Sequence, residues 1–362
     1  MKLALAPMAT LTHEPLRRLI HRYGDPDEYF SEMIHAPSFL AGGMFEPWYV
    51  RTAPCPERMV WQITGGRAEP IVKTAEGLVA LGGIGVDLNM GCSAPDIVRG
   101  GAGVAWMEKD PAEAAELVRA VREAVDRAAS QPASAEGSAK AKAAAAAGGP
   151  SRARLGVKLR LGSDGDYDRL LGFCSALVDS GADMLTLHPR ERRDKYSRPA
   201  RHGYTARLAR DLSVPVYANG DVASVADFLA LERDVPCAGV MIGRAAVTEP
   251  WIFRDIARER DAQKAGLPAS DGLPASEGLP AIDHLEVTRA FLGFLVEGQP
   301  PEFWLSRARR FFYYYCDNFS FAHHIKMRVQ NAKTLEDIEG LIEGYLEEVP
   351  GDRHRLRGGR VS

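Results

Sequence analysis

The residues with catalytic potential stand within or directly after short apolar runs. Cys92 follows the run VDLNM, three residues after Asn89, and Lys158 lies in the run GVKLRL two residues before Arg160. A thiol in an open loop can act as a nucleophile or as a proton donor. A lysine that faces an electron-rich ring can stabilise negative charge as it develops. These residue types favour an enzyme site with a reactive cysteine.

Two glycine-containing turns after the last two apolar runs are typical of phosphate binding. They are Asn219-Gly220-Asp221 and Gly243-Arg244. Gly220 and Gly243 let the backbone approach an anion, N–H groups at a helix start can donate to it, and Arg244 adds positive charge. We therefore predict a bound phosphate group at this pair of turns.

The apolar runs themselves predict a barrel. We expect strands at 3–6, 29–32, 59–63, 86–89, 156–159, 184–187, 216–218 and 239–242, with helices at 14–24, 68–82, 111–125 and 167–182 between them. Continuous apolar strands that alternate with helices form a parallel sheet covered by helices. Eight such units in about 250 residues predict a (β/α)8 TIM barrel. Residues 35–57 show no clear helix.

The barrel prediction brings the chemical residues together, because barrel active sites lie at the carboxyl ends of the strands. Nearly every predicted strand ends in polar or glycine-rich sequence. The residues at these ends are Ala6, Pro7, Met8, Glu32, Gln62, Asn89, Lys158, Arg160, His188, Arg190, Asn219, Gly220, Asp221, Gly243 and Arg244.

The pattern also divides the chain into parts. We predict a barrel over 1–262 with an Ala/Ser/Gly-rich insertion at about 130–153, and a linker over 263–282 in which GLPA recurs. Neither low-complexity segment can bury enough apolar surface to offset its ordering entropy. Four helical periods then predict a small all-α domain over 283–350, followed by a basic tail at 351–362.

Composition limits the classes of protein. The 362 residues carry 45 Lys and Arg against 48 Asp and Glu, so a net charge of −3 gives no overall sign of nucleic-acid binding. The five cysteines contain no C-x-x-C, which argues against a metal site or disulfide framework and for a cytoplasmic protein. No apolar run approaches the roughly 18 residues of a membrane helix. A monomer is the simplest expectation.

The order of these motifs resembles that of the tRNA-dihydrouridine synthases. The resemblance is carried by N-x-G-C, V-K-x-R, N-G-D and M-I-G-R. The matching segments are LALAPMATLTHEPLRRLI (3–20), VWQITG (60–65), GVDLNMGCSAP (85–95), GVKLRLG (156–162), LHPRERRDKYSRPA (187–200), VPVYANGDVAS (214–224) and GVMIGRAAVTEPWIF (239–253).

The resemblance implies an FMN-dependent reductase that uses NADPH or NADH to reduce the C5–C6 double bond of uridine in tRNA. Hydride would pass to uracil C6 while Cys92, as the general acid, protonates C5. It further implies flavin contacts from Pro7, Met8, Ala9, Gln62, Lys158 and His188, phosphate contacts from Asn219, Gly220, Asp221, Gly243 and Arg244, and uracil contacts from Asn89, Arg160 and Arg190.

The chain departs from the family pattern at three places. Ser93 stands where proline usually follows the cysteine, Asp96 and Ile97 stand where a lysine is common, and the stretch after His188 reads PRERRDKYSRPARH. None of these changes removes a catalytic group. They bear on which uridine is modified and on the phosphate contacts near Arg99.

A basic loop and an aromatic helix predict where RNA would bind. The loop 190–201, with Arg193, Lys195 and Tyr196, is rich in Arg and Lys and has only two acids. The segment 303–321 joins aromatic and basic residues, which are either a helix core with a solvated face or part of a positive clamp on folded RNA.

Two other functions fit the sequence less well. A flavin barrel that acts on a free small molecule would not need the basic loop or the helical domain, and turnover of free uracil would favour it. A non-catalytic tRNA-binding protein would not need Cys92, Lys158 and the phosphate turns, and RNA binding without flavin would favour it.

Overall fold

The structure, a computed structural model, describes residues 1–130, 152–194, 197–266, 282–356 and 360–361. Most of the predicted insertion at 130–153, most of the predicted linker at 263–282, part of the tail at 351–362, and Lys195 and Tyr196 lie outside these residues. No helix in the described ranges is long and apolar enough to span a membrane.

Two compact units make up the described chain. The first contains residues 1–9, 26–222 and 226–242, and the second contains residues 10–25, 223–225 and those from 243 onward. The domain boundaries expected at 262 and 283 stay predictions.

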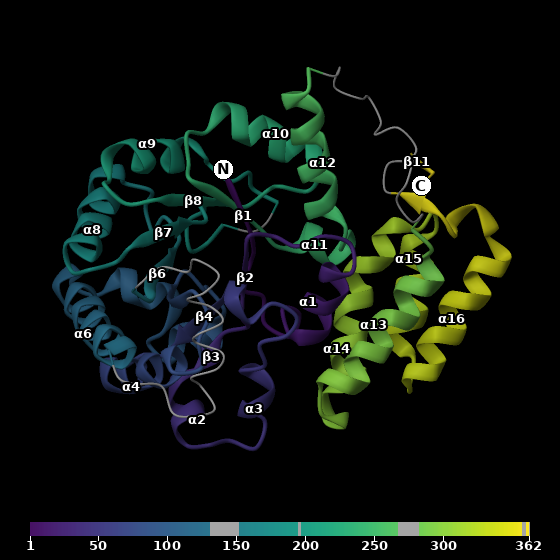
Figure 1. Ribbon diagram of the computed structural model, residues 1–362, viewed down its shortest axis with the longest axis horizontal. Coiled ribbons are helices and arrows are strands. Elements are labelled where there is room, and N and C mark those ends of the chain that lie inside the picture. Colours follow the sequence, from purple (N-terminus) through teal and green to yellow (C-terminus); the bar gives the residue numbers. More distant parts are fainter. Residues whose placement is uncertain (131–151, 195–196, 267–281, 357–359, 362) are drawn as a thin grey trace. The chain divides into compact units, whose positions relative to one another are not determined.

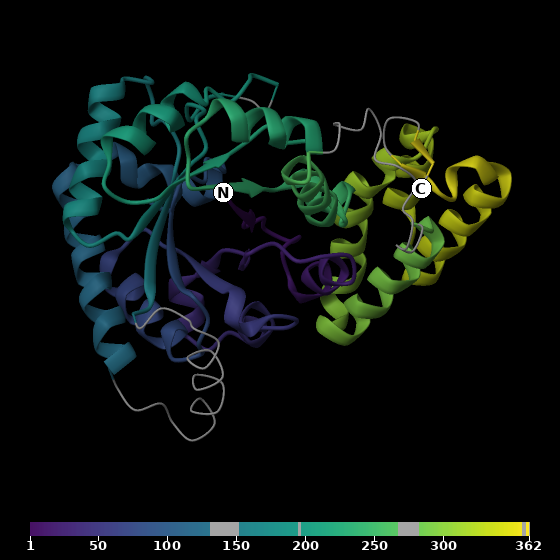
Figure 2. The same ribbon diagram turned by 45° about the horizontal axis from the view of Figure 1, so that its top comes forward.

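The first unit is a closed barrel of parallel strands (Figures 1 and 2). Its strands are β1 (Lys2–Leu5), β2 (Glu28–Phe30), β3 (Ile34–His35), β4 (Met59–Thr64), β5 (Gly85–Met90), β6 (Arg154–Leu159), β7 (Met184–Leu187), β8 (Val216–Asn219) and β9 (Gly239–Ile242). They pair in the order β2-β1-β9-β8-β7-β6-β5-β4, and β2 also pairs with β4, which closes the ring. The predicted (β/α)8 barrel is confirmed.

Helices surround these strands in Figure 1. They are α4 (Ala68–Val79), α6 (Pro111–Ser130), α8 (Tyr167–Asp179), α9 (Gly203–Asp211) and α10 (Val225–Asp234). The segment between β5 and α6 adds the short helix α5 (Pro95–Arg99) and the 3-10 turn η2 (Gly103–Glu108). Local signals fix their ends. The Asp166 side chain accepts a hydrogen bond from the Arg169 N–H at the start of α8, and Gly181, at φ 106°, follows its end.

The second β/α unit differs from the expected strand at 29–32. Its strand β2 is short, and the second short strand β3 pairs with the end of β4. The following segment has only the short helices α2 (Ala36–Leu40) and α3 (Glu46–Tyr49) and the 3-10 turn η1 (Pro56–Arg58). Each has proline in its first turn, where the missing N–H costs least, and apolar periodicity over so few residues is too brief to detect.

The barrel interior combines an apolar cluster with a buried ion pair. Ala4, Phe30, Met184 and Met241 are among the residues of this cluster. Arg154 donates to both carboxylate oxygens of Glu28, at 2.7 and 2.6 Å, and the Tyr217 hydroxyl donates to the same carboxylate at 3.0 Å. Although burial raises the pKa of Glu28, Arg154 and Tyr217 bring it below its usual value.

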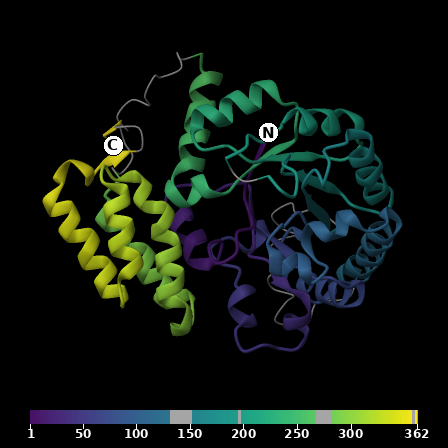
Figure 3. The ribbon, with the colours of Figure 1, turned by 180° about the vertical axis from the view of Figure 1, so that it is seen from behind.

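The second unit is helical, and its C-terminal helices pack together in Figure 3. Its helices are α1 (Glu14–His21), α11 (Arg244–Thr248), α12 (Ile252–Lys264), α13 (His284–Gly298), α14 (Pro301–Tyr315), α15 (Ala322–Asn331) and α16 (Leu335–Glu348). The 3-10 turns η3 (Cys316–Asn318) and η4 (Pro350–Asp352) and the paired strands β10 (Arg355–Leu356) and β11 (Arg360–Val361) complete it. The helices predicted over 283–350 are confirmed, and the two short strands lie beyond residue 350.

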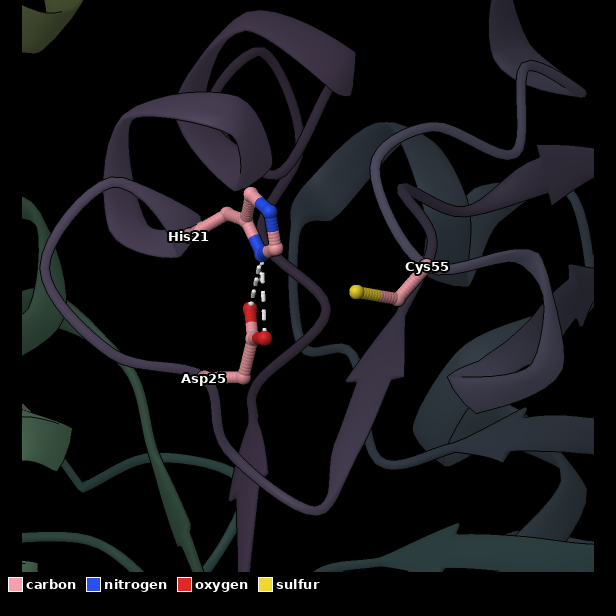
Figure 4. Close-up of side chains that lie close together, drawn as sticks. All are labelled: His21, Asp25 and Cys55. Carbon is pink, nitrogen blue, oxygen red and sulfur yellow. Dashed lines mark hydrogen bonds and ion pairs between the residues drawn. The ribbon is translucent and has the colours of Figure 1, made fainter.

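Side-chain hydrogen bonds form at the end of α1 and at the start of α16. His21 Nδ1, at the end of α1, is 2.8 and 2.9 Å from the two carboxylate oxygens of Asp25 (Figure 4). At the start of α16, Thr334 and Asp337 exchange the reciprocal bonds of a capping box. Such a box satisfies backbone N–H groups that a helix start leaves without partners.

The aromatic segment of α14 divides between core and surface. Phe311, Phe312 and Tyr315 are fully buried, and the rings of Phe291 and Phe311 stack at 3.7 Å. Tyr313 is 47% exposed, and Lys326 Nζ lies 5.0 Å from its ring centroid. The core interpretation therefore holds for three of the five consecutive aromatics, and Tyr313 remains available to a partner.

Loss of one partner of the buried ion pair should destabilise the barrel. Arg154→Met leaves the Glu28 carboxylate buried without its bidentate donor, and we expect a loss of about 3–5 kcal/mol of unfolding free energy. Lys73→Met is the matched control, because the Lys73–Glu69 pair is exposed and should contribute less than about 1 kcal/mol. Urea unfolding measures both, and equal losses would contradict the expectation.

Candidate active site

Strand register directs a row of polar side chains into the barrel. Gln62 on β4 pairs with Asp87 on β5, and Asn89 on β5 pairs with Lys158 on β6. Side chains alternate along a strand, so Asp87 and Asn89 share one face. Their mutual hydrogen-bond partner is Gln62, which is fully buried. The site is thus assembled across three neighbouring strands.

A hydrogen-bond relay runs from Asp87 to the backbone at Cys92. Gln62 Nε2 donates to Asp87 Oδ2 at 2.7 Å, and Asn89 Nδ2 donates to Gln62 Oε1 at 2.8 Å. Asn89 Oδ1 then accepts from the N–H groups of Cys92, at 2.9 Å, and Gly91, at 3.3 Å. The relay fixes the loop that carries the cysteine.

The loop after β5 also folds back on itself at Cys92. The Val104 N–H donates to the Cys92 carbonyl at 2.9 Å, and Gly103 adopts a left-handed φ of 61°. A Cβ at Gly103 would lie 2.3 Å from the Cys92 carbonyl oxygen. Cys92 is partly exposed and forms no disulfide. The backbone that carries the thiol is therefore constrained, and the residue is partly exposed.

Lys158 contributes an ammonium group to this site. Within the described part of the chain, its Nζ has no hydrogen bond or ion pair. Burial lowers the pKa of Lys158 to about 8, while Asp87 and Cys92 act to raise it. Burial likewise raises the pKa of Asp87 to about 7, and Gln62 and Lys158 oppose that shift. Lys158 is thus positively charged at neutral pH with its donors available.

Arg160 joins two loops of the mouth. Its Nε donates to the Gly91 carbonyl at 3.0 Å, and its NH1 donates to the Glu191 carbonyl at 3.2 Å. The side chain is buried. Arg160 therefore ties the Cys92 loop to the loop that follows β7.

His188 and Arg190 form a second buried cluster after β7. Arg190 donates from NH1 to His188 Nε2 at 2.7 Å, from NH2 to Asp221 at 2.5 Å, and from Nε to the Arg198 carbonyl at 2.7 Å. Because arginine can only donate, His188 Nε2 is the acceptor and its proton is on Nδ1. Burial, followed by Lys158 and Arg160, lowers the pKa of His188 to about 2.

The Asn219-Gly220-Asp221 turn lies against this cluster. Asn219 Nδ2 donates to the Met241 carbonyl at 2.8 Å, and Asp221 also accepts from the Ala200 N–H at 2.5 Å. Gly220 has a φ of 116°, and a Cβ there would lie 2.9 Å from the His188 ring. Glycine at this position is required by both the backbone conformation and the close approach.

The basic loop after β7 is largely paired with acids. Arg192 binds Glu108 at 2.6 and 2.8 Å, Arg198 binds Asp194 at 3.0 Å, and Arg201 binds Glu191 and Asp194, both at 2.9 Å. Arg193 is exposed. Lys195 and Tyr196 lie outside the described residues.

The remaining predicted residues lie at the ends of β1 and β9. Met8 packs against the interior apolar cluster, next in sequence to Pro7 and Ala9. Gly243 directly follows β9 and precedes α11, whose first residue is Arg244. Gly243 and Arg244 belong to the second compact unit. The roles predicted for all these residues stay predictions.

Sequence reasoning missed Asp87. It stands within the apolar run GVDLNM, where an acid can occupy either face of a strand. A carboxylate in a fully buried strand is nonetheless a signal, because such groups are rarely buried without a partner or a function. The partner, Gln62, is 25 residues away in sequence, so only the strand register reveals it.

The mouth has polar groups that suit a flavin phosphate cofactor. Lys158 offers its ammonium group, and Thr186 Oγ1 is buried without a partner in the described ranges. Buried polar groups without partners are uncommon in folded proteins and often belong to ligand sites. The residues present therefore fit FMN.

Comparisons with known proteins place this chain among tRNA-modifying enzymes. The family model for dihydrouridine synthase (Dus) matches residues 4–141 and 140–271. The chain is 32% identical to a tRNA-dihydrouridine(16) synthase of Cupriavidus necator, over 69% of this chain and 72% of that protein. It is 30% identical to tRNA-dihydrouridine synthase B of Pseudomonas syringae, over 70% of this chain and 67% of that protein. A tRNA-dihydrouridine(16) synthase of Neisseria meningitidis is 25% identical over 96% of both chains.

A side chain at Gly103 should displace Cys92. Gly103→Ala forces alanine into a left-handed conformation against the Cys92 carbonyl, and we expect a loss of about 1–3 kcal/mol in unfolding free energy. The rate of Cys92 alkylation should change with it. Gly172→Ala, in α8 with open space around it, should instead stabilise by up to about 1 kcal/mol. Unchanged Cys92 alkylation in Gly103→Ala would contradict the close contact.

The neutral His188 should make the fold sensitive to acid. Unfolding raises its pKa from about 2 towards the ordinary value of about 6.5, so the unfolded state binds the extra proton and stability falls as pH drops below about 6.5. Between pH 7 and pH 5, the wild type should lose about 1–2 kcal/mol more than His188→Asn. Urea unfolding at several pH values measures this difference, and parallel pH profiles would refute it.

Proposed function

We propose that this chain, which belongs to the dihydrouridine synthase family, reduces the C5–C6 double bond of uridine in tRNA. The observation that carries the proposal is the constrained Cys92 loop, fixed by Asn89 beside the charged Lys158 in one barrel mouth. A proton donor and a cationic group in one cleft suit the reduction of a polarised double bond.

FMN is the cofactor that we propose for the barrel mouth. Lys158, Gln62 and His188 would contact its ring and chain, with Pro7, Met8 and Ala9 beside them. Its phosphate would bind the turns Asn219-Gly220-Asp221 and Gly243-Arg244, because backbone N–H groups and arginine favour a phosphate anion. When bound and reduced by NADPH or NADH, FMN supplies the hydride for uracil C6.

Cys92 would supply the proton to uracil C5. Cys92 is partly exposed, and the two hydrogen bonds that Asn89 accepts from Gly91 and Cys92 limit the movement of the loop. Such fixed geometry is what a proton transfer in the transition state requires. Asn89, Arg160 and Arg190 would orient the uracil, Arg190 through the loop that it holds.

The partner would be folded tRNA, bound through its backbone. Arg193, Lys195 and Tyr196 would contact it at the mouth, and the exposed Tyr313 offers a stacking surface on the helical unit. The target uridine must leave its stack to reach the barrel interior. We further propose a monomer that acts in the cytoplasm, where tRNA and reduced nicotinamide are present.

Replacement of Cys92 tests the proposal. Cys92→Ala should lower the rate of tRNA reduction by about 10²–10⁴-fold, because the general acid is lost, while NADPH still bleaches the flavin bands. Cys237→Ala is the matched control, since that cysteine is also partly exposed but lies outside the site. The measurement is anaerobic recovery of the flavin spectrum on addition of unmodified tRNA.

Three outcomes would contradict the proposal. Wild-type rates in Cys92→Ala would remove the proton-donor role. Turnover of free uracil without any response to tRNA would favour a small-molecule reductase. A colourless protein that FMN cannot reconstitute, but that still binds tRNA, would favour a non-catalytic RNA-binding protein.

A further inference from the structure

Asp87 is the end of the relay that leads to Cys92. The Asp87 side chain is fully buried, and one oxygen accepts from Gln62. The other oxygen, Oδ1, has no hydrogen-bond partner among the residues that the structure describes. An unsatisfied buried carboxyl oxygen is unfavourable by itself. Its retention in the barrel interior therefore calls for a function.

The surroundings make room for this carboxyl group. Gly156 lies opposite Asp87 in the strand register, and a Cβ at Gly156 would lie 2.8 Å from Asp87 Oδ1. A larger residue on β6 would thus push the carboxyl group away from Gln62. Lys158 and Arg154 favour the ionised form of Asp87, whereas burial and Glu28 oppose it.

The hydrogen-bond partners allow only one orientation for each amide side chain between Asp87 and Cys92. The Gln62 carbonyl accepts from the Asn89 NH2 group, so Gln62 presents its own NH2 group to Asp87, whose oxygen accepts. Asn89 then presents its NH2 group to Gln62 and its carbonyl to the loop. The N–H groups of Gly91 and Cys92 can only donate, and they meet that carbonyl. Each amide orientation is consistent from both ends.

We propose that Asp87 is the positioning residue for the Cys92 loop, acting through the oriented amides of Gln62 and Asn89. Asp87 does not touch the thiol. It provides the acceptor that keeps the Gln62 amide in one orientation, and the relay transmits that orientation to the backbone N–H of Cys92. For the reduction of uridine, this inference rests on the proposed function, whereas the relay itself does not.

The first test removes the acceptor and compares it with a variant that keeps it. Asp87→Leu keeps the branching of the side chain but cannot accept, whereas Asp87→Asn can still offer its carbonyl to Gln62. Hydrogen–deuterium exchange of the full chain should show Gly91 and Cys92 amides exchanging at least about tenfold faster in Asp87→Leu. In Asp87→Asn their exchange should stay within about threefold of wild type.

Activity supplies a second readout. In Asp87→Leu, kcat for tRNA reduction should fall at least about tenfold with little change in the KM for tRNA, because the general acid is misplaced while RNA binding is intact. Equal exchange of the Gly91 and Cys92 amides in Asp87→Leu and wild type would overturn the proposal. So would an equal loss of protection in Asp87→Leu and Asp87→Asn.

A second pair of variants covers the case in which Asp87→Leu does not fold. Gln62→Glu places two carboxylates face to face and should expose the loop amides to exchange. In the double variant Gln62→Glu/Asp87→Asn, the introduced asparagine amide can donate to the introduced carboxylate, which still accepts from Asn89. Protection should then recover at Gly91 and Cys92, and a double variant no better than Gln62→Glu would also overturn the proposal.

Failure of this inference differs from failure of the proposed function. If wild-type protein does not reduce tRNA, the proposed function fails, yet the exchange measurements still test the relay. If wild-type protein reduces tRNA but Asp87→Leu keeps both its loop protection and its kcat, the positioning role fails alone.

Discussion

Charged and polar side chains buried inside a parallel barrel must find their partners there, and this requirement shapes the rest of the fold. Successive side chains of each strand point alternately into the barrel and out of it. The side chains that point inward are shielded from water. Glu28 can be buried because Arg154 and Tyr217 satisfy its carboxylate. Asp87 can be buried because Gln62 and nearby cations offset part of its desolvation. Packing, strand register and chemistry are therefore decided together.

The buried polar groups of the barrel differ in how many of their hydrogen bonds are formed within the protein. The Glu28 carboxylate accepts two hydrogen bonds from Arg154 and one from Tyr217, which suits a structural role, although Arg154 Nε has no partner among the described residues. Lys158 and Thr186 have donors or acceptors left over among the described residues, and both lie on neighbouring strands in register. Unsatisfied groups at the carboxyl ends of strands are where a barrel enzyme binds its ligands.

The loops around the mouth owe their order to internal pairing. Arg190 connects His188, Asp221 and the Arg198 carbonyl, and Arg160 connects the Cys92 loop to the Glu191 carbonyl. Arginines that look like an RNA-binding cluster in the sequence are therefore partly committed to the fold. The charge left for a phosphate backbone is smaller than the sequence count, which is consistent with recognition of RNA by shape as well as charge.

Local patterns in the chain were enough to predict the barrel, the C-terminal helices and the strand-end residues Cys92, Lys158 and His188. Apolar periodicity and glycine stops are local signals, so they predict elements directly. The short helices at 36–49 escaped detection because they span too few residues for a period. The burial of Arg190 and the path from Asp87 to Cys92 became visible only in the folded chain. Both depend on strand register and on partners 25 or more residues apart, which no local pattern encodes.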